Sequence, residues 1–230
     1  AYVDGKMAGI GKFTLLYDGS AWLETLRVDP KYQGLGVGKK LYENYFKQAQ
    51  EHACKSMAMY TGTSNMVSAG LASNFGFKKA QDFRGYNLIT FVPSNREHHF
   101  ESVGPERGAE LILSLAREYH DYLVSNRTFY KINPDTAEGF ALEEKVFENL
   151  QTESFIVYGA RFQKELCLHI SMMGGDYESC LAFAKDFAFS RKIPKITFTI
   201  PLKNPGLERF LIERGFEREA SDLITMEINL

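Results

Sequence analysis

Residues 28–41 read VDPKYQGLGVGKKL, and this stretch decides how the first half of the chain is interpreted. Gly34, Gly36 and Gly38 carry no side chains that would keep a ligand away from the backbone. Apolar residues then recur at helical spacing, so the stretch precedes a predicted helix. The first N–H groups of that helix would point outward, with the positive end of the helix dipole behind them. The stretch therefore predicts an anion site suited to phosphate.

Two other kinds of phosphate loop are excluded by single positions. A Walker A loop needs glycine at position 33 and serine or threonine at position 40, where the chain has Gln33 and Lys40. A dinucleotide fingerprint starting at Gly34 needs glycine at position 39, and one starting at Gly36 needs it at position 41. Neither glycine is present.

The segments around the loop predict an α/β arrangement, in which strand, loop, helix and strand follow one another. Asp4-Gly5 and Asp18-Gly19 favour hairpin turns, and Pro30 ends the strand that leads to the loop. The expected strands cover residues 2–10, 12–17, 21–28, 56–60 and 84–92, and the expected helices run from the loop to about residue 54 and over residues 65–74.

The segment Gln33-Gly-Leu-Gly36-Val-Gly38 fits the pattern Gln/Arg-x-x-Gly-x-Gly/Ala, and here the chain resembles the GNAT superfamily of acetyl-CoA-dependent N-acetyltransferases. The resemblance implies that the loop backbone holds the pyrophosphate of CoA. Asn65 is a second match, because the superfamily has an asparagine there that contacts the cofactor, although asparagine is also an ordinary helix N-cap. The residues to which the resemblance assigns cofactor binding are Leu26, Val28, Gln33, Gly34, Leu35, Gly36, Val37, Gly38, Lys39 and Asn65.

Glu24 is the candidate catalytic residue. N-acetylation needs a neutral amine, and a carboxylate near the acetyl group helps to remove the proton of the amine. Glu24 lies on the strand that leads to the loop, where several superfamily members carry a glutamate. Two placements stay open: a general base among the apolar neighbours Trp22 and Leu26, or a side chain that points to solvent.

The chain departs from the superfamily at the general acid. Many members carry a tyrosine that protonates the leaving thiolate, and that position is Ala72 here. Tyr60 or Tyr86 would reach the site from a strand only in some geometries. Either water protonates the thiolate or activity is impaired.

The second half of the chain repeats features of the first. Asn204 and Gly215-Phe216 each lie 139 residues after Asn65 and Gly76-Phe77, and both sets follow a short apolar strand. A fixed offset of this kind indicates duplicated units. The other helices expected here cover residues 109–123, 141–150 and 179–191, and the expected strands cover residues 155–162, 166–173 and 195–200.

We therefore expect two domains of a mixed α/β fold: a GNAT-like acetyl-CoA-binding domain over residues 1–93 and a degenerate GNAT-like domain over residues 94–230. The second domain lacks the phosphate loop, since residues 172–176 read MMGGD. A carboxylate there would repel phosphate, although Asp176 is also a sound N-cap. The first domain starts at the hairpin strands, whereas other members of the superfamily begin with a strand and two helices. Either these elements precede residue 1 in a longer chain or another part of this chain covers the face that they would occupy.

Composition excludes several classes of partner. A formal net charge of −2 argues against a broad basic surface for nucleic acid or an anionic membrane. No apolar run approaches the roughly 20 residues that span a bilayer, and the first residues do not resemble a signal peptide. The three cysteines have no metal-binding spacing and His98-His99 has no further ligands at suitable spacing, so we expect no metal. Without a signal peptide or a membrane-spanning run, we expect a cytoplasmic location.

The resemblance implies an N-acetyltransferase that transfers an acetyl group from acetyl-CoA to a primary amine of a small molecule or peptide. The alternative is a non-catalytic acyl-CoA-binding sensor or structural module, which the alanine at position 72 favours. These motifs do not define the acceptor, and they leave open whether the chain forms a homodimer.

Overall fold

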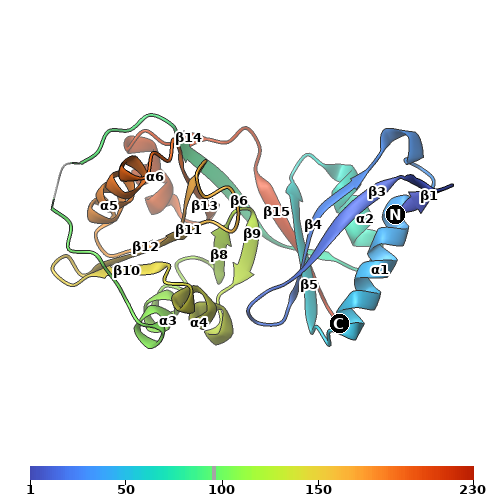
Figure 1. Ribbon diagram of the computed structural model, residues 1–230, viewed down its shortest axis with the longest axis horizontal. Coiled ribbons are helices and arrows are strands. Elements are labelled where there is room, and N and C mark those ends of the chain that lie inside the picture. The colour runs from blue at the N-terminus through green and yellow to red at the C-terminus, as the bar shows by residue number, and fades with distance from the viewer. Residues whose placement is uncertain (95–96) are drawn as a thin grey trace. The chain divides into compact units, whose positions relative to one another are not determined.

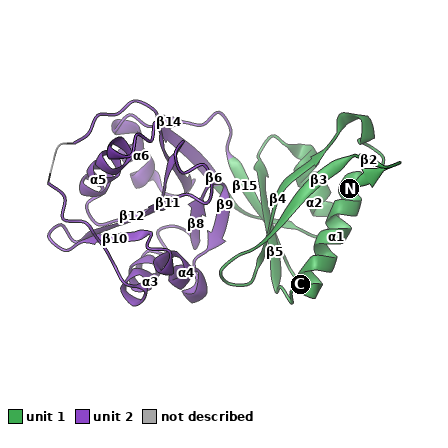
Figure 2. Ribbon diagram, in the orientation of Figure 1, with its two compact units in different colours: residues 1–82, 223–230 green, residues 83–222 purple. Residues whose placement is uncertain are grey.

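A computed structural model describes residues 1–94 and 97–230 (Figure 1). The chain divides into two compact units (Figure 2). Unit 1 contains residues 1–82 and 223–230, and unit 2 contains residues 83–222. The boundary expected at residue 93 differs from this division, because the chain leaves unit 1 eleven residues earlier and its last eight residues return to it.

Unit 1 is a sheet with two helices on one side. Its elements are β1 (Tyr2–Val3), β2 (Lys6–Met7), β3 (Gly9–Leu15), β4 (Ala21–Val28), the 3-10 turn η1 (Pro30–Tyr32), α1 (Val37–Glu51), β5 (Ser56–Gly62), α2 (Met66–Asn74), the start of β6 (Lys78–Leu88) and β15 (Leu223–Asn229). The two helices meet where Tyr42 stacks on Phe75, with ring centroids 4.8 Å apart. They share one apolar core with β4, β5 and β15.

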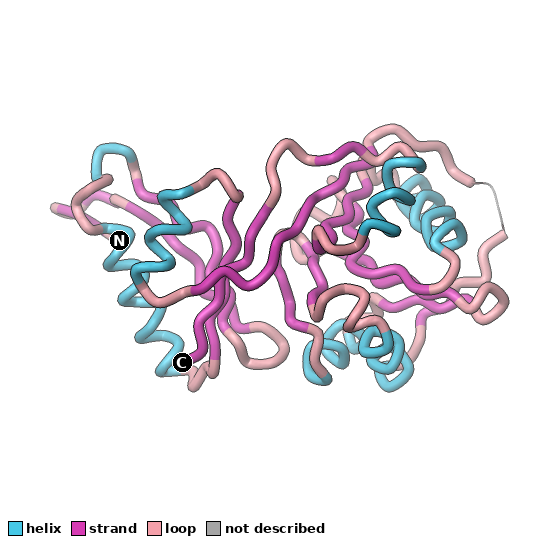
Figure 3. Tube along the Cα trace, turned by 180° about the vertical axis from the view of Figure 1, so that it is seen from behind, coloured by secondary structure: helices cyan, strands magenta, loops and turns pink. Residues whose placement is uncertain are grey.

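Unit 2 places its strands between two pairs of helices, α3 with α4 and α5 with α6 (Figures 1 and 3). Its elements are the rest of β6, β7 (Glu101–Ser102), α3 (Pro105–Ser114), β8 (Tyr122–Ser125), β9 (Thr128–Lys131), α4 (Pro134–Leu142), β10 (Val146–Asn149), β11 (Ser154–Gly159), β12 (Leu168–Gly174), α5 (Tyr177–Ser190), β13 (Ile196–Pro201), α6 (Pro205–Glu213) and β14 (Glu217–Arg218).

Two expected helices of the second half are wrong in extent. The helix expected over 109–123 ends at Ser114, where the N–H groups of Leu115 and Ala116 bond to carbonyls three residues back instead of four. His120 and Asp121 then adopt positive φ, and residues 122–125 form β8. The helix expected over 141–150 ends at Leu142, and residues 146–149 instead form a strand that pairs with β11.

The strand expected over 84–92 also differs in extent. It is β6, which begins at Lys78 directly after the glycine-phenylalanine pair that ends α2 and stops at Leu88. Ile89 and Val92 are exposed and lie beyond the strand.

The two units have the same sequence of strand directions. In unit 1, β3 and β4 are antiparallel, β4 and β5 parallel, and β5 and β15 antiparallel. In unit 2, β11 and β12 are antiparallel, β12 and β13 parallel, and β13 and β6 antiparallel. The place beside β5 in unit 1 is thus filled by the last strand of the chain. The corresponding place in unit 2 is filled by the strand that leaves unit 1.

The 139-residue repeat has the same local geometry in both units. Asn65 accepts a hydrogen bond from the N–H of Ser68 (3.1 Å), and Asn204 accepts one from the N–H of Leu207 (3.2 Å). The helices that they cap end at glycines with φ near +88° and +83°, a conformation that glycine adopts without strain.

Met226 offers a test of the role of β15 in unit 1. Its side chain is buried in the core of that unit, so we expect Met226→Ala to lower the free energy of unfolding by about 2–4 kcal/mol. Trp22, the single tryptophan of the chain, is fully buried in unit 1, and its fluorescence during urea unfolding reports on that unit.

Asn229→Ala is the matched control, since Asn229 lies on the same strand and is exposed. An unchanged unfolding midpoint for Met226→Ala would show that β15 does not support unit 1.

Candidate functional site

The glycine-rich loop joins β4 to α1 through a short 3-10 turn. Asp29 caps this turn by accepting a hydrogen bond from the N–H of Lys31 (2.9 Å). Gln33 follows, and its Nε2 donates to the carbonyl of Val28 (3.4 Å), which ties the loop back to the end of β4. These two hydrogen bonds give the predicted loop a defined conformation.

Two glycines give the loop its shape. Gly34 and Gly36 have φ of +78° and +79°, in the left-handed region that favours glycine. A Cβ atom built at either position would meet no atom within 4 Å, so the space above the backbone is empty. That space is available to a ligand that approaches the main chain closely.

The N-terminus of α1 has neither a side-chain cap nor an acidic residue in its first turn, whereas α3, which also begins at a glycine, has Glu106 there. The N-cap of α1 is Gly36. The described helices capped by an asparagine or aspartate side chain are α2, α4, α5 and α6. The first N–H groups of α1 therefore need a partner from outside the chain, and an anion suits both these donors and the helix dipole.

A cavity of about 760 Å³ opens above this loop. Most of the residues predicted to bind a cofactor line it; they are Leu26, Val28, Gln33, Gly34, Gly36, Val37, Gly38, Lys39 and Asn65. Leu35 belongs to the loop but does not line the cavity, and its side chain is 67% exposed. Tyr42, Met59 and Ser68 also line it, although no sequence motif indicates them.

β4 and β5 part beyond Leu23. Their parallel pairing covers Ala21–Leu23 and Met57–Met59 and then stops. Thr25 has a φ of +60°, and the register of β3 against β4 shifts opposite it, between Ile10 and Lys12. This bulge bends β4 away from its neighbour, as an extra residue in one strand does.

A second cavity, of about 380 Å³, lies where the strands part. Glu24, Thr25, Tyr45, Tyr60 and Thr61 are among its lining residues. It shares part of its wall with the first cavity; the shared residues are Leu26, Arg27, Tyr42, Met59, Asn65 and Ser68. The two cavities therefore adjoin, and a long ligand anchored at the loop can reach the place where the strands separate.

Glu24 lies in the wall of the second cavity with its side chain 12% exposed. Its Oε1 accepts a hydrogen bond from the Lys12 Nζ (2.9 Å), directly across the β3–β4 pair, and one from the Thr14 Oγ1 (2.7 Å). The carboxylate is thus held in place by two donors at the edge of the cavity. This placement differs from a side chain that points to open solvent.

The tyrosines near the second cavity are not those expected from the superfamily pattern. Ala72 is fully buried in the core of unit 1. Tyr60 lines the second cavity, whereas Tyr86 belongs to unit 2, where it pairs with β13. Tyr45 lines the cavity from α1, and no sequence motif indicates it.

Unit 2 shows a corresponding separation of strands that is closed by a side chain. Pairing of β12 with β13 stops at Ile170, and the register of β11 against β12 shifts at the next residue. The hydroxyl of Tyr119, which is 1% exposed, accepts from the N–H of Met173 (2.9 Å) and donates to the carbonyl of the same residue (2.9 Å). The backbone groups of β12 at this point are therefore already satisfied.

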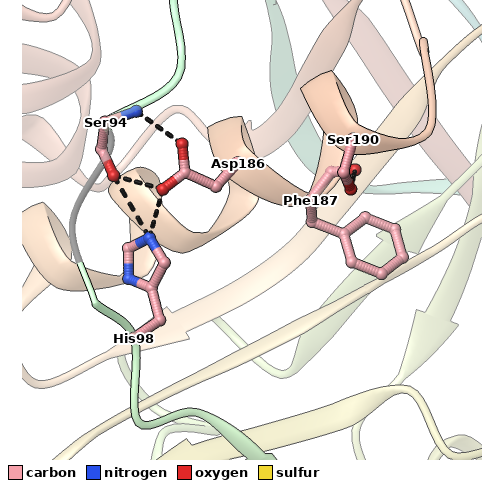
Figure 4. A network of polar contacts seen from close by, with 5 residues as sticks. All are labelled: Ser94, His98, Asp186, Phe187 and Ser190. Carbon is pink, nitrogen blue, oxygen red and sulfur yellow. Dashed lines mark hydrogen bonds and ion pairs between the residues drawn. The ribbon is translucent and has the colours of Figure 1, made fainter.

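Ser94, His98 and Asp186 also lie together in unit 2 (Figure 4). The Nε2 of His98 contacts both the Ser94 Oγ (3.2 Å) and the Asp186 Oδ2 (2.5 Å), and Asp186 also accepts from the backbone and hydroxyl of Ser94. A nucleophilic relay needs the imidazole between serine and aspartate, with a different ring nitrogen on each. The cluster instead fastens the segment after β6 to α5.

The charge of Asp186 fits this fastening role. Burial raises the pKa of its carboxyl group, but the hydrogen bonds from Ser94 and His98 lower it by more, so that the pKa lies below its ordinary value.

Among the residues that the structure describes, no group of three or more His, Cys, Asp or Glu side chains could hold a metal ion. In the same part of the chain, no helix has the length and apolarity needed to cross a bilayer.

Residues 1–77 match the sequence model of the Acetyltransferase (GNAT) family. The chain is 29% identical over 98 residues to the spermine/spermidine N(1)-acetyltransferase of Bacillus subtilis, covering 38% of this chain and 64% of that protein. It is 29% identical over 87 residues to the [ribosomal protein bS18]-alanine N-acetyltransferase of Escherichia coli, covering 38% of this chain and 58% of that protein. The chain thus spans less than two thirds of the length of these relatives.

Solved structures extend the likeness in fold to the whole chain. A GCN5-related N-acetyltransferase from Sphaerobacter thermophilus superposes with a TM-score of 0.62 at 12% identity, covering 98% of this chain and 78% of that one. A tandem GNAT protein from the clavulanic acid biosynthesis pathway gives a TM-score of 0.60 at 12% identity, covering 99% and 81%. Residues 1–77 thus match the GNAT acetyltransferase family in sequence, and the chain as a whole shares the fold of solved GNAT proteins.

Proposed function

We propose that the chain is an N-acetyltransferase that transfers an acetyl group from acetyl-CoA to the primary amine of a small molecule or peptide. One observation carries the proposal: an uncapped glycine loop at the start of α1 adjoins a cavity formed where β4 and β5 part. An anionic group at the loop and a reactive group between the strands match the two ends of acetyl-CoA.

The residues of the loop fit the phosphate end of acetyl-CoA. The N–H groups after Gly36 suit the pyrophosphate, and Lys39 lines the cavity, whereas Lys40 is paired with Glu43 (2.7 Å). Asn65 uses its side-chain oxygen to cap α2, which leaves its NH₂ group to donate to a ligand carbonyl. Leu26 and Val28 complete the wall that a pantetheine arm would follow.

Glu24 is the group that we assign to the proton of the acceptor amine. A protonated amine has no free electron pair, so the amine must lose a proton before its nitrogen attacks the thioester carbon. The carboxylate of Glu24 is fixed by Lys12 and Thr14 at the edge of the second cavity. It is therefore positioned to receive that proton directly or through one water molecule.

We propose a primary amine as the class of acceptor. The two relatives are named for spermine or spermidine and for an alanine of a ribosomal protein, and both names describe acetylation at a nitrogen. The second candidate function is a non-catalytic acyl-CoA-binding module. Burial of Ala72 favours it, because the residue that often serves as general acid is missing.

We further propose that the chain is a duplication in which only unit 1 binds acetyl-CoA. The shared strand directions and the 139-residue repeat support the duplication. In unit 2, Tyr119 satisfies the backbone where the strands part, and Asp176 caps α5 by accepting from the N–H of Glu178 (3.0 Å). Both features of the unit 1 site are thus replaced by contacts within the chain.

Gly36 tests the assignment of the loop. Aspartate and asparagine have similar shapes and tolerate positive φ better than other non-glycine residues, so Gly36→Asp and Gly36→Asn differ mainly in charge. We expect Gly36→Asp to bind acetyl-CoA at least about tenfold more weakly than Gly36→Asn, a difference of about 1.4 kcal/mol. Calorimetric titration of both variants measures this, and equal affinities would contradict an anion site at this loop.

Turnover tests the two candidate functions. We expect the protein to release free CoA thiol from acetyl-CoA in the presence of an accepted amine, whereas a binding module would release none across an amine panel. Glu24→Gln should lower the rate about a hundredfold at neutral pH and leave acetyl-CoA affinity unchanged. The deficit should shrink as pH rises toward the amine pKa, because the amine then loses its proton to solvent. A variant with the wild-type rate at every pH would remove Glu24 from this role.

Stoichiometry tests the asymmetry between the units. Calorimetric titration should give one acetyl-CoA per chain, since the second set of backbone donors is occupied by Tyr119 and Asp176. Gly36→Asp should weaken this single site. Two equivalent sites per chain would contradict the proposal.

A further inference from the structure

The hydroxyl of Tyr45 is a buried polar group without a partner. The residue is 2% exposed, and its hydroxyl makes no hydrogen bond to any residue that the structure describes. Buried polar groups in folded proteins nearly always have a partner, because an unpaired one loses its water without compensation. An exception inside a candidate site points to a partner that comes from outside the chain.

The chain makes room for this hydroxyl at one position of β3. A Cβ atom built on Gly11 would lie 1.8 Å from the Tyr45 hydroxyl oxygen, a distance that excludes any side chain there. Gly11 lies at the register shift between Ile10 and Lys12, opposite the bulge of β4. The hydroxyl is therefore seated against the point where β4 bends away from β5.

The position of Tyr45 relative to the two cavities indicates which part of a ligand it would meet. Tyr45 lines the second cavity and is absent from the wall of the first, where the phosphate loop lies. Glu24 lines the same second cavity. Tyr45 and Glu24 thus both belong to the reactive end of the site rather than to its phosphate end.

We propose that the Tyr45 hydroxyl donates a hydrogen bond to the acetyl thioester during acetyl transfer. The inference rests on the proposed function and adds a residue to its site. When the amine nitrogen bonds to the thioester carbon, negative charge develops on the thioester oxygen before the carbon–sulfur bond breaks and the thiolate leaves. A fixed, buried donor stabilises that charge more than it stabilises the ground state.

Tyr45 acts in this scheme as a donor that keeps its proton. Burial raises the pKa of its hydroxyl to about 12, so the group stays neutral at working pH. The proton of the amine goes to Glu24, and the departing thiolate takes its proton from solvent. Tyr45 is therefore not an ionising group in the pH dependence of the reaction.

The test is Tyr45→Phe, which removes the oxygen and keeps the ring. We expect the maximal rate of thiol release to fall about tenfold or more, while acetyl-CoA affinity, measured by calorimetry without amine, changes less than about threefold. The pH profile should keep its shape at a lower level. The unliganded variant should melt at the same temperature as the wild type or higher, because it lacks the unpaired hydroxyl.

Tyr119→Phe is the matched control, since the Tyr119 hydroxyl is also buried but is bonded to the backbone of Met173. It should lower the melting temperature and leave the rate per folded molecule unchanged. A wild-type rate for Tyr45→Phe in an active enzyme would overturn the role of Tyr45 alone. A clearly lower melting temperature for Tyr45→Phe would also overturn it, by showing that the hydroxyl has a structural partner. A wild-type protein that neither binds acetyl-CoA nor releases thiol would overturn the proposed function and this inference with it.

Discussion

The parting of β4 from β5 after Leu23 is the constraint on which the rest of unit 1 depends. Two strands that stop pairing leave backbone N–H and C=O groups that the ladder no longer satisfies. Such an edge inside a sheet is tolerated only where something else meets those groups. The bulge at Thr25, the glycine at position 11 and the tyrosines of α1 are all arranged around this opening.

Unit 2 shows the other way to meet the same requirement. Its strands also part after a short parallel stretch, and there the hydroxyl of Tyr119 contacts both backbone groups of Met173. A single side chain can thus close an opening of this kind permanently. A unit that binds a ligand must leave the opening free and accept the lower stability of its unliganded form, as the unpaired hydroxyl of Tyr45 illustrates.

The parts of the site that could be predicted from the sequence are those with local causes. The loop follows from the glycines between Gln33 and Lys39, and Asn65 follows from its place before a helix. Tyr45 could not be found in this way, because an amphipathic helix indicates that a tyrosine is buried but not whether its hydroxyl has a partner.

The differences between the predicted and the observed fold arise where tertiary contacts, not local sequence, decide the structure. The apolar spacing that predicts a helix over 109–123 includes residues beyond Ser114 that are buried by tertiary contacts and do not belong to a helix. The place of β15 depends on pairing between residues 56–62 and 223–229, which no local pattern reveals. The unit boundary differs from the expected one for the same reason.

The long separation between β5 and β15 has a consequence for synthesis of the chain. All of unit 2, residues 83–222, must be translated before the strand that pairs with β5 exists. At about 5–20 residues per second, this takes on the order of ten seconds. During that interval the nascent unit 1 presents an unpaired strand edge, so we expect ribosome-bound intermediates of this chain to depend on chaperones that cover such edges.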